Sequence, residues 1–263
     1  MARPARSVSL RVLGCGDAFG SGGRSHTCFF LDAPSTKLVI DFGASALVSM
    51  HRFGVDPAAI DAIVLSHLHG DHYAGLPFLL LDALFVTRRT RPLVIAGPRS
   101  VSDRFHKLCD AMFPGTWDHS KRFALEFLEY EDGQPLTVAG ATVTPYPVLH
   151  DSGAQAYALR VSCDGCTVAY SGDTAWTDNL IETARDADIF FCEATTFVKP
   201  IPNHLTYREV IAKRRALTAK RIVLTHLGPD VLARRKQLAL TSARDGQLFV
   251  LSRPRKTVRG VRL

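Results

Sequence analysis

The chain is a series of short apolar runs separated by turn-forming residues, and most of the runs have the length and β-branched content of buried strands. Strands are predicted at 8–13, 27–31, 37–40, 63–65, 93–96, 123–130, 135–138, 141–148, 167–170, 188–192 and 221–225. Longer apolar runs predict helices at 76–89, at 101–112 after a capping Ser100, and from 206 to about 217. Strands interspersed with helices in this way indicate an α/β protein.

The stretch 63–75 stands apart because its apolar strand ends abruptly in three histidines and an aspartate. If strand geometry persists beyond the apolar run, His67 and His69 project to the same side and both imidazoles can reach one cation. Asp71 and His72 follow on a turn, where a carboxylate oxygen and a further nitrogen can serve a second cation. The stretch therefore predicts a dinuclear metal site at a strand end.

Later in the chain, more ligand-type residues follow apolar runs directly. They are His150, Asp173, Glu193 and His226. The two oxygens of a carboxylate such as Asp173 can bridge two cations. Taken singly, each residue is interpreted as a polar side chain that ends a buried strand. Their recurrence at strand ends is what a site at one rim of a β-sandwich requires.

The pattern His67-x-His69-x-Asp71-His72 resembles the signature of the metallo-β-lactamase fold, a superfamily of mostly zinc-dependent hydrolases. The resemblance implies a four-layer αββα sandwich and two divalent cations, zinc first, with manganese or iron as alternatives. It implies that the first cation is bound by His67, His69 and His150. The second would be bound by Asp71, His72 and His226, and the carboxylate of Asp173 would bridge the two. It also implies that Asp41 supports the metal loop and does not bind metal.

His204 and Glu193 indicate which branch of this superfamily the chain resembles. His204 lies just before a predicted helix, at which Thr206 and Glu209 have capping-box spacing. Together with Glu193 it resembles the ribonuclease Z-like phosphodiesterases, in which an equivalent histidine, oriented by a glutamate, acts on the leaving group. On that hypothesis Asp71 is both a metal ligand and the base that orients the attacking hydroxide. A plain loop histidine is the alternative interpretation of His204.

The segment 151–172 leaves no room for the long arm with which ribonuclease Z grips tRNA. The smaller phosphodiesterases of that branch, which act on cyclic or other compact phosphodiesters, are the closer comparison, and an RNA-related substrate stays open. A lactonase or other carboxyl-ester hydrolase is the alternative, because its metal ligands are nearly the same. A nucleic-acid-binding protein with structural metals is a third hypothesis.

Glycines are concentrated in the segment 14–23, which lacks the ending of a nucleotide-binding P-loop. This segment predicts a loop whose backbone approaches the active site. His26, just beyond it, is interpreted as an ordinary hydrogen-bonded loop histidine, with a substrate-facing side chain as the alternative. Gly70 and Gly75 bracket the metal stretch and predict that its backbone turns sharply.

Composition narrows the class of protein. With 263 residues, 46% hydrophobic and 22% charged, the chain is predicted to form one domain over 1–263. No apolar run follows the arginines of 1–6 and no segment reaches membrane-spanning length, so we expect a cytoplasmic protein without membrane contact. The cysteines are scattered except for Cys163 and Cys166, which are interpreted as two thiols flanking a tight hairpin turn. A homodimer stays open.

Basic residues are concentrated at the C-terminal end. The whole chain has a net charge of +7, and the segment 234–263 has nine basic residues against one acidic residue, so the remaining 233 residues are close to neutral. The run 253–259 could contact RNA or another phosphate-rich partner. A solvated tail is the alternative, because no aromatic residue lies among these cations to stack on bases.

Overall fold

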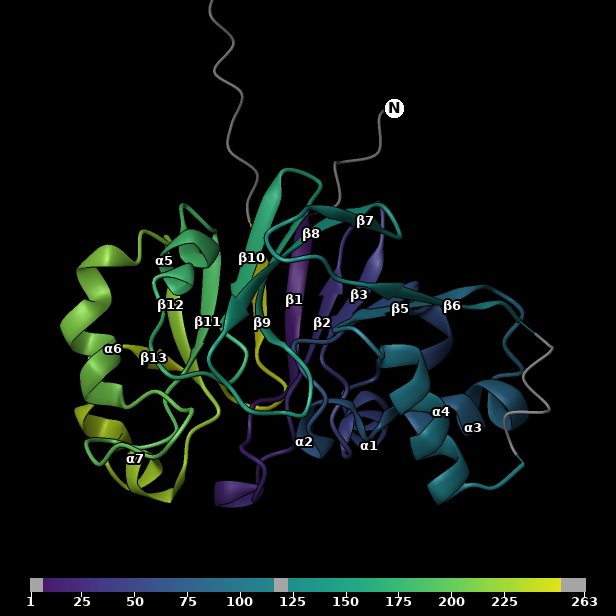
Figure 1. The fold of residues 1–263 in the computed structure, drawn as a ribbon, viewed down its shortest axis with the longest axis horizontal. Helices are drawn as coiled ribbons and strands as arrows, with labels where there is room; N and C mark the ends of the chain where they lie inside the picture. Colours follow the sequence, from purple (N-terminus) through teal and green to yellow (C-terminus); the bar gives the residue numbers. More distant parts are fainter. Residues whose placement is uncertain (1–6, 116–122, 252–263) are drawn as a thin grey trace, which may run out of the picture.

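Two seven-stranded sheets lie face to face in the computed structural model, which describes residues 7–115 and 123–251 (Figure 1). The first sheet has the order β14-β1-β2-β3-β4-β5-β6 and consists of β14 (Leu248–Leu251), β1 (Val8–Gly14), β2 (Cys28–Asp32), β3 (Lys37–Ile40), β4 (Ala62–Val64), β5 (Leu93–Gly97) and β6 (Leu125–Glu129). The second has the order β13-β12-β11-β10-β9-β8-β7 and consists of β13 (Thr241–Ser242), β12 (Ile222–Thr225), β11 (Ile189–Glu193), β10 (Cys166–Tyr170), β9 (Ala156–Cys163), β8 (Ala141–Val148) and β7 (Leu136–Val138).

Helices cover the outer face of each sheet, on the right and on the left of Figure 1. The first sheet is covered by α1 (Ala46–Arg52), α2 (Gly70–Tyr73), α3 (Leu76–Leu81) and α4 (Val101–Met112). The second is covered by α5 (Asn179–Ala184), α6 (Tyr207–Lys213) and α7 (Pro229–Ala233). Short turns of other helix types are η1 (Ser21–Gly23), η2 (Pro57–Ala59), η3 (Asp82–Val86), η5 (Arg214–Ala216) and η6 (Arg235–Gln237). The predicted four-layer αββα sandwich is confirmed.

The central core lies between the two sheets and includes aromatic contacts across them. The ring of Phe29 on β2 stacks on that of Phe191 on β11, with centroids 4.6 Å apart. The same Phe29 ring meets Tyr170, at the end of β10, edge to face at 5.4 Å. Such pairs add about 0.5–1.5 kcal/mol to the free energy gained from burial alone. They hold the ends of β10 and β11 against the first sheet.

The predicted helix 76–89 is shorter in the structure than in the prediction. Its regular part ends at Leu81, and a π-helical turn, η3, continues to Val86. Arg89 then turns inward, and its guanidinium donates hydrogen bonds to four backbone carbonyls, including those of Ala58 and Ile60. The prediction failed at this end because burying a charged guanidinium requires acceptors that a continuing helix could not supply.

Helix α4 begins and ends where the sequence predicts, but the predicted cap is wrong. The φ angle of Ser100 is 68°, and its hydroxyl makes no capping hydrogen bond. Its backbone N–H donates instead to Glu129 Oε1 at 2.7 Å. A cap from the neighbouring strand therefore replaces the expected local one, which only the tertiary structure could reveal.

The hairpin of β9 and β10 agrees with its prediction. Cys163 pairs with Cys166, and both turn residues between them, Asp164 and Gly165, have positive φ angles of 48° and 76°. This is the geometry of a two-residue hairpin turn, which an Asp-Gly pair favours. Both cysteines are buried, and neither forms a disulfide within the described residues. None of the described helices is long and apolar enough to cross a bilayer.

Gly75 is required by close packing and not by the sharp turn that the sequence suggests. Its φ angle is −76°, which any residue can adopt. A Cβ atom at this position would overlap the carbonyl oxygen of Gly43 and lie 2.8 Å from that of Phe42. Gly70 differs, since a Cβ there would meet only the Ala74 side chain at 3.8 Å.

We expect Gly75→Ala to lower the free energy of unfolding by about 1–3 kcal/mol, because two rigid backbone segments would have to move apart. The matched change Gly70→Ala should be neutral, or stabilising by up to about 1 kcal/mol, since alanine favours helix over glycine. Urea denaturation followed by circular dichroism measures both. Equal losses in the two variants would contradict the packing explanation.

Candidate metal centre

Ligand-type side chains from both sheets meet at one rim of the sandwich. In the second sheet β8, β10, β11 and β12 run in the same direction, so their carboxyl ends share an edge. In the first sheet β3 and β4 are likewise parallel. Glu193 is the last residue of β11, and seven further candidates lie just beyond the ends of these strands: His67, His69, Asp71, His72, His150, Asp173 and His226. Each sheet therefore contributes side chains to one place.

Four overlapping groups of side chains in this rim could each hold a metal ion, and two of them include His204: His150, Asp173 and His204; and Glu193, His204 and His226. The other two groups are His67, His69 and His150, and Asp71, His72, Asp173 and His226. Within each group the candidate ligand atoms lie within 4.8 Å of one another. The last two groups contain the seven residues that the sequence picked out, divided in the same way apart from Asp173, which was expected to serve both cations.

The loop that holds the first four candidates is not a continuation of the strand. Strand β4 ends at Val64. Two residues later, the backbone N–H of Ser66 donates to the Asp41 carboxylate at 2.7 Å instead of to a neighbouring strand. His69 is then the residue that precedes helix α2, on which His72 lies. His67 and His69 therefore lie beyond the strand, although His69 keeps an extended backbone with φ −83° and ψ 151°, and the centroids of their rings are 5.0 Å apart.

Asp41 stands behind this loop as a buried anchor. Its carboxylate accepts hydrogen bonds from the Ser66 N–H and from the Ser66 hydroxyl, both at 2.7 Å. It also lies 2.8 Å from Nδ1 of His72. The φ angle of Asp41 is 55°, a left-handed conformation that aspartate tolerates better than most residues. The supporting position that the resemblance implied for Asp41 agrees with these contacts.

In both His67 and His72, the ring nitrogen Nδ1 points away from the centre of the site and faces a hydrogen-bond acceptor. Nδ1 of His72 donates to Asp41, because a carboxylate can only accept. Nδ1 of His67 lies 3.0 Å from the Ser66 hydroxyl, whose own proton is given to Asp41. Both rings therefore carry a proton on Nδ1, so Nε2 is the nitrogen that faces the site and would bind a metal ion.

His150 and His226 follow the same rule with different partners. Nδ1 of His150 lies 3.0 Å from the backbone carbonyl oxygen of Asn203, a residue with a φ angle of 63°. Nδ1 of His226 lies 3.1 Å from the hydroxyl of Thr195, which donates its proton to Glu193 at 2.5 Å. Nε2 of each ring is thereby left to face the interior of the site.

Several inward-facing atoms have no hydrogen-bond partner in the described part of the chain. They are Nε2 of His67, Nε2 of His72 and Oδ1 of Asp173, and all three are buried. Oδ2 of Asp173 lies 3.2 Å from Nε2 of His226, 3.3 Å from that of His72 and 4.0 Å from that of His67. Buried polar atoms without partners cost free energy, and a cation between them would remove that cost. The donor set fits divalent metal ions.

Electrostatics in the metal-free chain are consistent with this fit. Burial, together with the neighbouring His72, lowers the pKa of His67 well below its usual value, so His67 is a neutral ligand. Burial opposes ionisation of Asp173, but His226 and His72 outweigh it and hold its pKa well below the usual range. In His226 burial is outweighed by Asp173 and Asp71, which raise its pKa to about 9. Histidines and carboxylates therefore stabilise one another's charged forms within this cluster.

His204 lies beside the seven predicted ligands and is held by Glu193. Nδ1 of His204 is 3.1 Å from Oε1 of Glu193, whose side chain is fully buried. Oε1 also accepts the Thr174 N–H at 2.6 Å. The His204 ring is 5.0 Å from that of His150, and its side chain retains 18% exposure to solvent. Burial lowers the pKa of His204, but the contact with Glu193 outweighs this and raises it.

The segment leading into helix α6 explains the place of His204. Thr206 caps the helix, and its hydroxyl accepts the Glu209 N–H at 3.1 Å, as the sequence spacing predicts. A short parallel bridge joins Thr206 to Thr196, just after β11. This bridge brings the residues before the helix to the end of the strand that contains Glu193. The alternative of a plain loop histidine therefore leaves the contact with Glu193 unexplained.

The glycine-rich loop lies against the site, as predicted. The carbonyl oxygen of Cys15 accepts the His226 N–H at 3.1 Å, and Gly16 forms a bridge with His26. Nδ1 of His26 is buried and has no hydrogen-bond partner among the described residues, so the expectation of an ordinary hydrogen-bonded ring is wrong for this atom. The basic run 253–259 lies outside the described residues.

Sequence reasoning missed three residues that orient the ligands. Ser66 and Thr195 act through single hydroxyl groups, which have no pattern of their own in a sequence. Asn203 acts through its backbone carbonyl, so its side chain does not mark the contact. The available signals were position alone, since Ser66 precedes the histidine motif and Thr195 closely follows Glu193.

Comparison with known proteins agrees with this geometry. The chain is 34% identical over 236 residues to the uncharacterized protein Rv1339 of Mycobacterium tuberculosis, covering 85% of this chain and 82% of that protein. It is 26% identical over 273 residues to ribonuclease Z of Clostridium beijerinckii, covering 84% and 88%. The crystal structure of the metallo-β-lactamase fold protein YhfI from Bacillus subtilis superimposes with a TM-score of 0.75 at 23% identity, covering 93% of this chain and 99% of that one.

These relatives identify the superfamily and its general chemistry. They are metallo-β-lactamase fold proteins that include ribonuclease Z, which agrees with the resemblance seen in the histidine motif. The similarity to metallo-hydrolases and the histidine–aspartate groups support a metal-dependent hydrolase. Residues 8–249 match the family described as Anti-Pycsar protein Apyc1. Because that match spans nearly the whole chain, the protein belongs to the Anti-Pycsar protein Apyc1 family, within the metallo-β-lactamase fold superfamily.

Proposed function

We propose that this protein is a dinuclear-metal phosphodiesterase that acts on a small or cyclic phosphodiester, with an RNA-related substrate as the wider class. The observation that carries the proposal is the pairing of His204 with the buried Glu193 at the edge of the metal groups. Ester hydrolysis with a poor leaving group needs a proton donor there, and a histidine oriented by a carboxylate supplies one. The relationship to ribonuclease Z supports the same class of substrate.

In this proposal the two metal ions take the ligands that the groups offer. His67, His69 and His150 would hold the first ion, while Asp71, His72 and His226 would hold the second. Asp173 would serve both, since its carboxylate lies near histidines of each group. Imidazole-rich sets with carboxylates suit zinc, and manganese or iron are the alternatives. When bound, the ions supply a lowered pKa for the attacking water and positive charge beside the phosphate oxygens.

The protein's own side chains then handle the protons. Asp71 is 9% exposed at the floor of the site, and its carboxylate is held between His72 and His226, at 3.1 and 3.3 Å. From there it orients the attacking water and accepts its proton. His204 keeps Nδ1 on Glu193 and donates the proton on Nε2 to the departing oxygen. Glu193 stabilises the charged form of the His204 ring before the transfer.

The connection between His150 and Asp173 favours a compact substrate. The residues between them form the hairpin of β9 and β10 and the short loops on either side of it. No long arm projects from this described segment. The substrate therefore depends on the rim of the site itself, which suits a cyclic or otherwise small phosphodiester.

Replacing His204 by Ala should slow hydrolysis of an unactivated phosphodiester by about 10²–10⁴-fold, the usual contribution of a positioned acid. Bis-p-nitrophenyl phosphate should lose far less, because its leaving group hardly needs a proton. Steady-state rates on both substrates test this, with metal analysis to check that the variant retains its ions. Equal losses on the two substrates would remove His204 from the role of acid.

The competing activity is hydrolysis of a lactone or other carboxyl ester by the same ligand set. Metal-loaded protein assayed on a linear diester, a cyclic nucleotide and a lactone should turn over the phosphate substrates faster. Asp71→Ala should abolish that turnover, because it removes both a ligand and the base. Faster lactone hydrolysis would favour the esterase. Full activity in Asp71→Ala would remove Asp71 from both roles, and absence of turnover of all three substrates by the metal-loaded protein would favour a binding protein with structural metals.

The contacts of Asp41 predict that it controls metal affinity from behind the ligands. Asp41→Asn keeps the size of the side chain but presents an amide nitrogen to donors, so the proton on His72 Nδ1 loses its acceptor. Metal affinity should fall by about 10- to 100-fold, as for other partners of ligating histidines. Competition with a chromophoric chelator measures it. Asp32→Asn, which breaks only the surface ion pair with Lys37, is the control and should leave affinity unchanged.

A further inference from the structure

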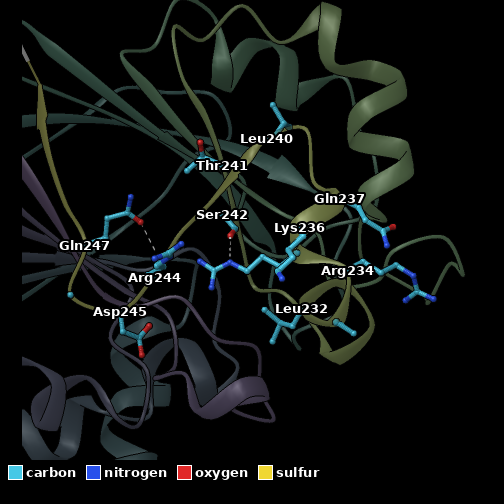
Figure 2. Close-up of a pocket in the computed structure, with 13 residues that line it drawn as sticks. Leu232, Arg234, Lys236, Gln237, Leu240, Thr241, Ser242, Arg244, Asp245 and Gln247 are labelled. Carbon is cyan, nitrogen blue, oxygen red and sulfur yellow. Dashed lines mark hydrogen bonds between the residues drawn. The ribbon is translucent and has the colours of Figure 1, made fainter.

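A second concave surface lies on the edge of the sandwich formed by β13 and β14. Figure 2 shows this surface, here called the basic groove, between helix α7, turn η6 and the segment that joins β13 to β14. Its volume is about 1150 Å³, large enough for a small molecule. Its cationic lining residues are Arg234, Arg235, Lys236 and Arg244. None of the proposed metal ligands lines it.

The cations of the basic groove have no acidic partner within residues 7–115 and 123–251. Nε of Arg235 donates to the Ser242 hydroxyl at 3.0 Å, and Nη1 of Arg234 donates to a backbone carbonyl at 2.8 Å. Neither contact neutralises charge. Arg234, Lys236 and Arg244 are exposed, so their side chains are accessible to a ligand.

Asp245 is the only acidic residue among the described residues that line the groove, and its carboxylate is already engaged. Oδ1 accepts the Cys15 N–H at 3.1 Å, and Oδ2 accepts the Ser25 N–H at 2.7 Å. Figure 2 shows this side chain directed toward the glycine-rich loop and away from the arginines. The four cations of the groove therefore outnumber its one carboxylate, which is hydrogen-bonded elsewhere.

Like charges crowd one another here. Burial lowers the pKa of Arg235, and the neighbouring Arg244 and Arg24 lower it further. Crowded cations repel, and an anion with several charges placed between them would turn the repulsion into attraction. Guanidinium groups also match the paired oxygens of a phosphate group.

The other residues that line the basic groove indicate which class of anion it would bind. The other lining residues include Gln237, Thr241 and Gln247, which offer hydrogen bonds, and two leucines. None of the described lining residues is aromatic, so the groove offers no stacking surface for a base. Recognition would therefore depend on phosphate oxygens. We propose that the basic groove binds a small anion with several phosphate groups, at a site separate from the metal centre.

This binding does not depend on the proposed hydrolase activity. Titration calorimetry of the metal-loaded protein with inorganic tripolyphosphate tests it, using Mg²⁺-saturated tripolyphosphate so that the probe does not strip metal from the centre. The variant R235Q/R244Q should bind about 10- to 100-fold more weakly, because two charge-assisted contacts are lost. The control R214Q/R215Q removes the same charge from exposed positions outside the groove and should bind like the unaltered protein.

Each outcome of this titration either supports or overturns the proposal. Binding that weakens with added salt and is lost only in R235Q/R244Q supports the proposal. Absence of binding to the unaltered protein, or equal loss in both double variants, overturns it. A short single-stranded RNA that binds through the groove while tripolyphosphate does not would overturn it in favour of nucleic acid. Circular dichroism melting should show that R235Q/R244Q remains folded, since the change removes repulsion and no ion pair.

Discussion

The metal centre depends on one buried carboxylate, that of Asp41, which receives three hydrogen bonds from two neighbouring segments. Two of these bonds come from the backbone N–H and the hydroxyl of Ser66, just beyond the end of strand β4, so this N–H does not pair with a neighbouring strand. The third fixes the ring of His72. A charged carboxylate removed from water must be satisfied by donors, and here the donors are the groups that shape the ligand loop. The loop and its anchor therefore stabilise each other.

The remaining ligands depend on the direction of the strands. Because β8, β10, β11 and β12 are mutually parallel, the candidate ligands His150, Asp173 and His226 lie at the one edge where these strands end, beside Glu193. The aromatic contact of Phe29 with Phe191 holds that edge against the first sheet. Outside the ligands, hydroxyls and a carbonyl hold the rings of His67, His150 and His226. This preorganisation leaves several nitrogen lone pairs and carboxylate oxygens converging on a small buried volume.

A hydrogen-bond network lies at the rim of the candidate metal centre. His204 is attached to Glu193, and Glu193 is in turn held by Thr174 and Thr195, so the proposed acid belongs to the same hydrogen-bond network that orients His226. The network links a ligand of one metal group to the residue beside the other. The chain belongs to the Anti-Pycsar protein Apyc1 family and is related to ribonuclease Z. We therefore expect this network to influence substrate preference.

The sequence by itself determined most of the strands and the candidate ligands, because apolar runs that end in histidine or aspartate are local patterns, and the four-layer sandwich followed from the resemblance of the histidine motif to a known fold. It also determined the capped entry to helix α6, since Thr206 and Glu209 act over three residues. The tertiary structure alone decided how the ligands are held. Ser66, Thr195 and Asn203 orient imidazoles through a hydroxyl or a backbone carbonyl. Position 75 requires glycine because the backbone of another segment lies too close for a Cβ atom. Contacts between segments far apart in the chain leave no periodic trace in either segment, so only the folded chain displays them.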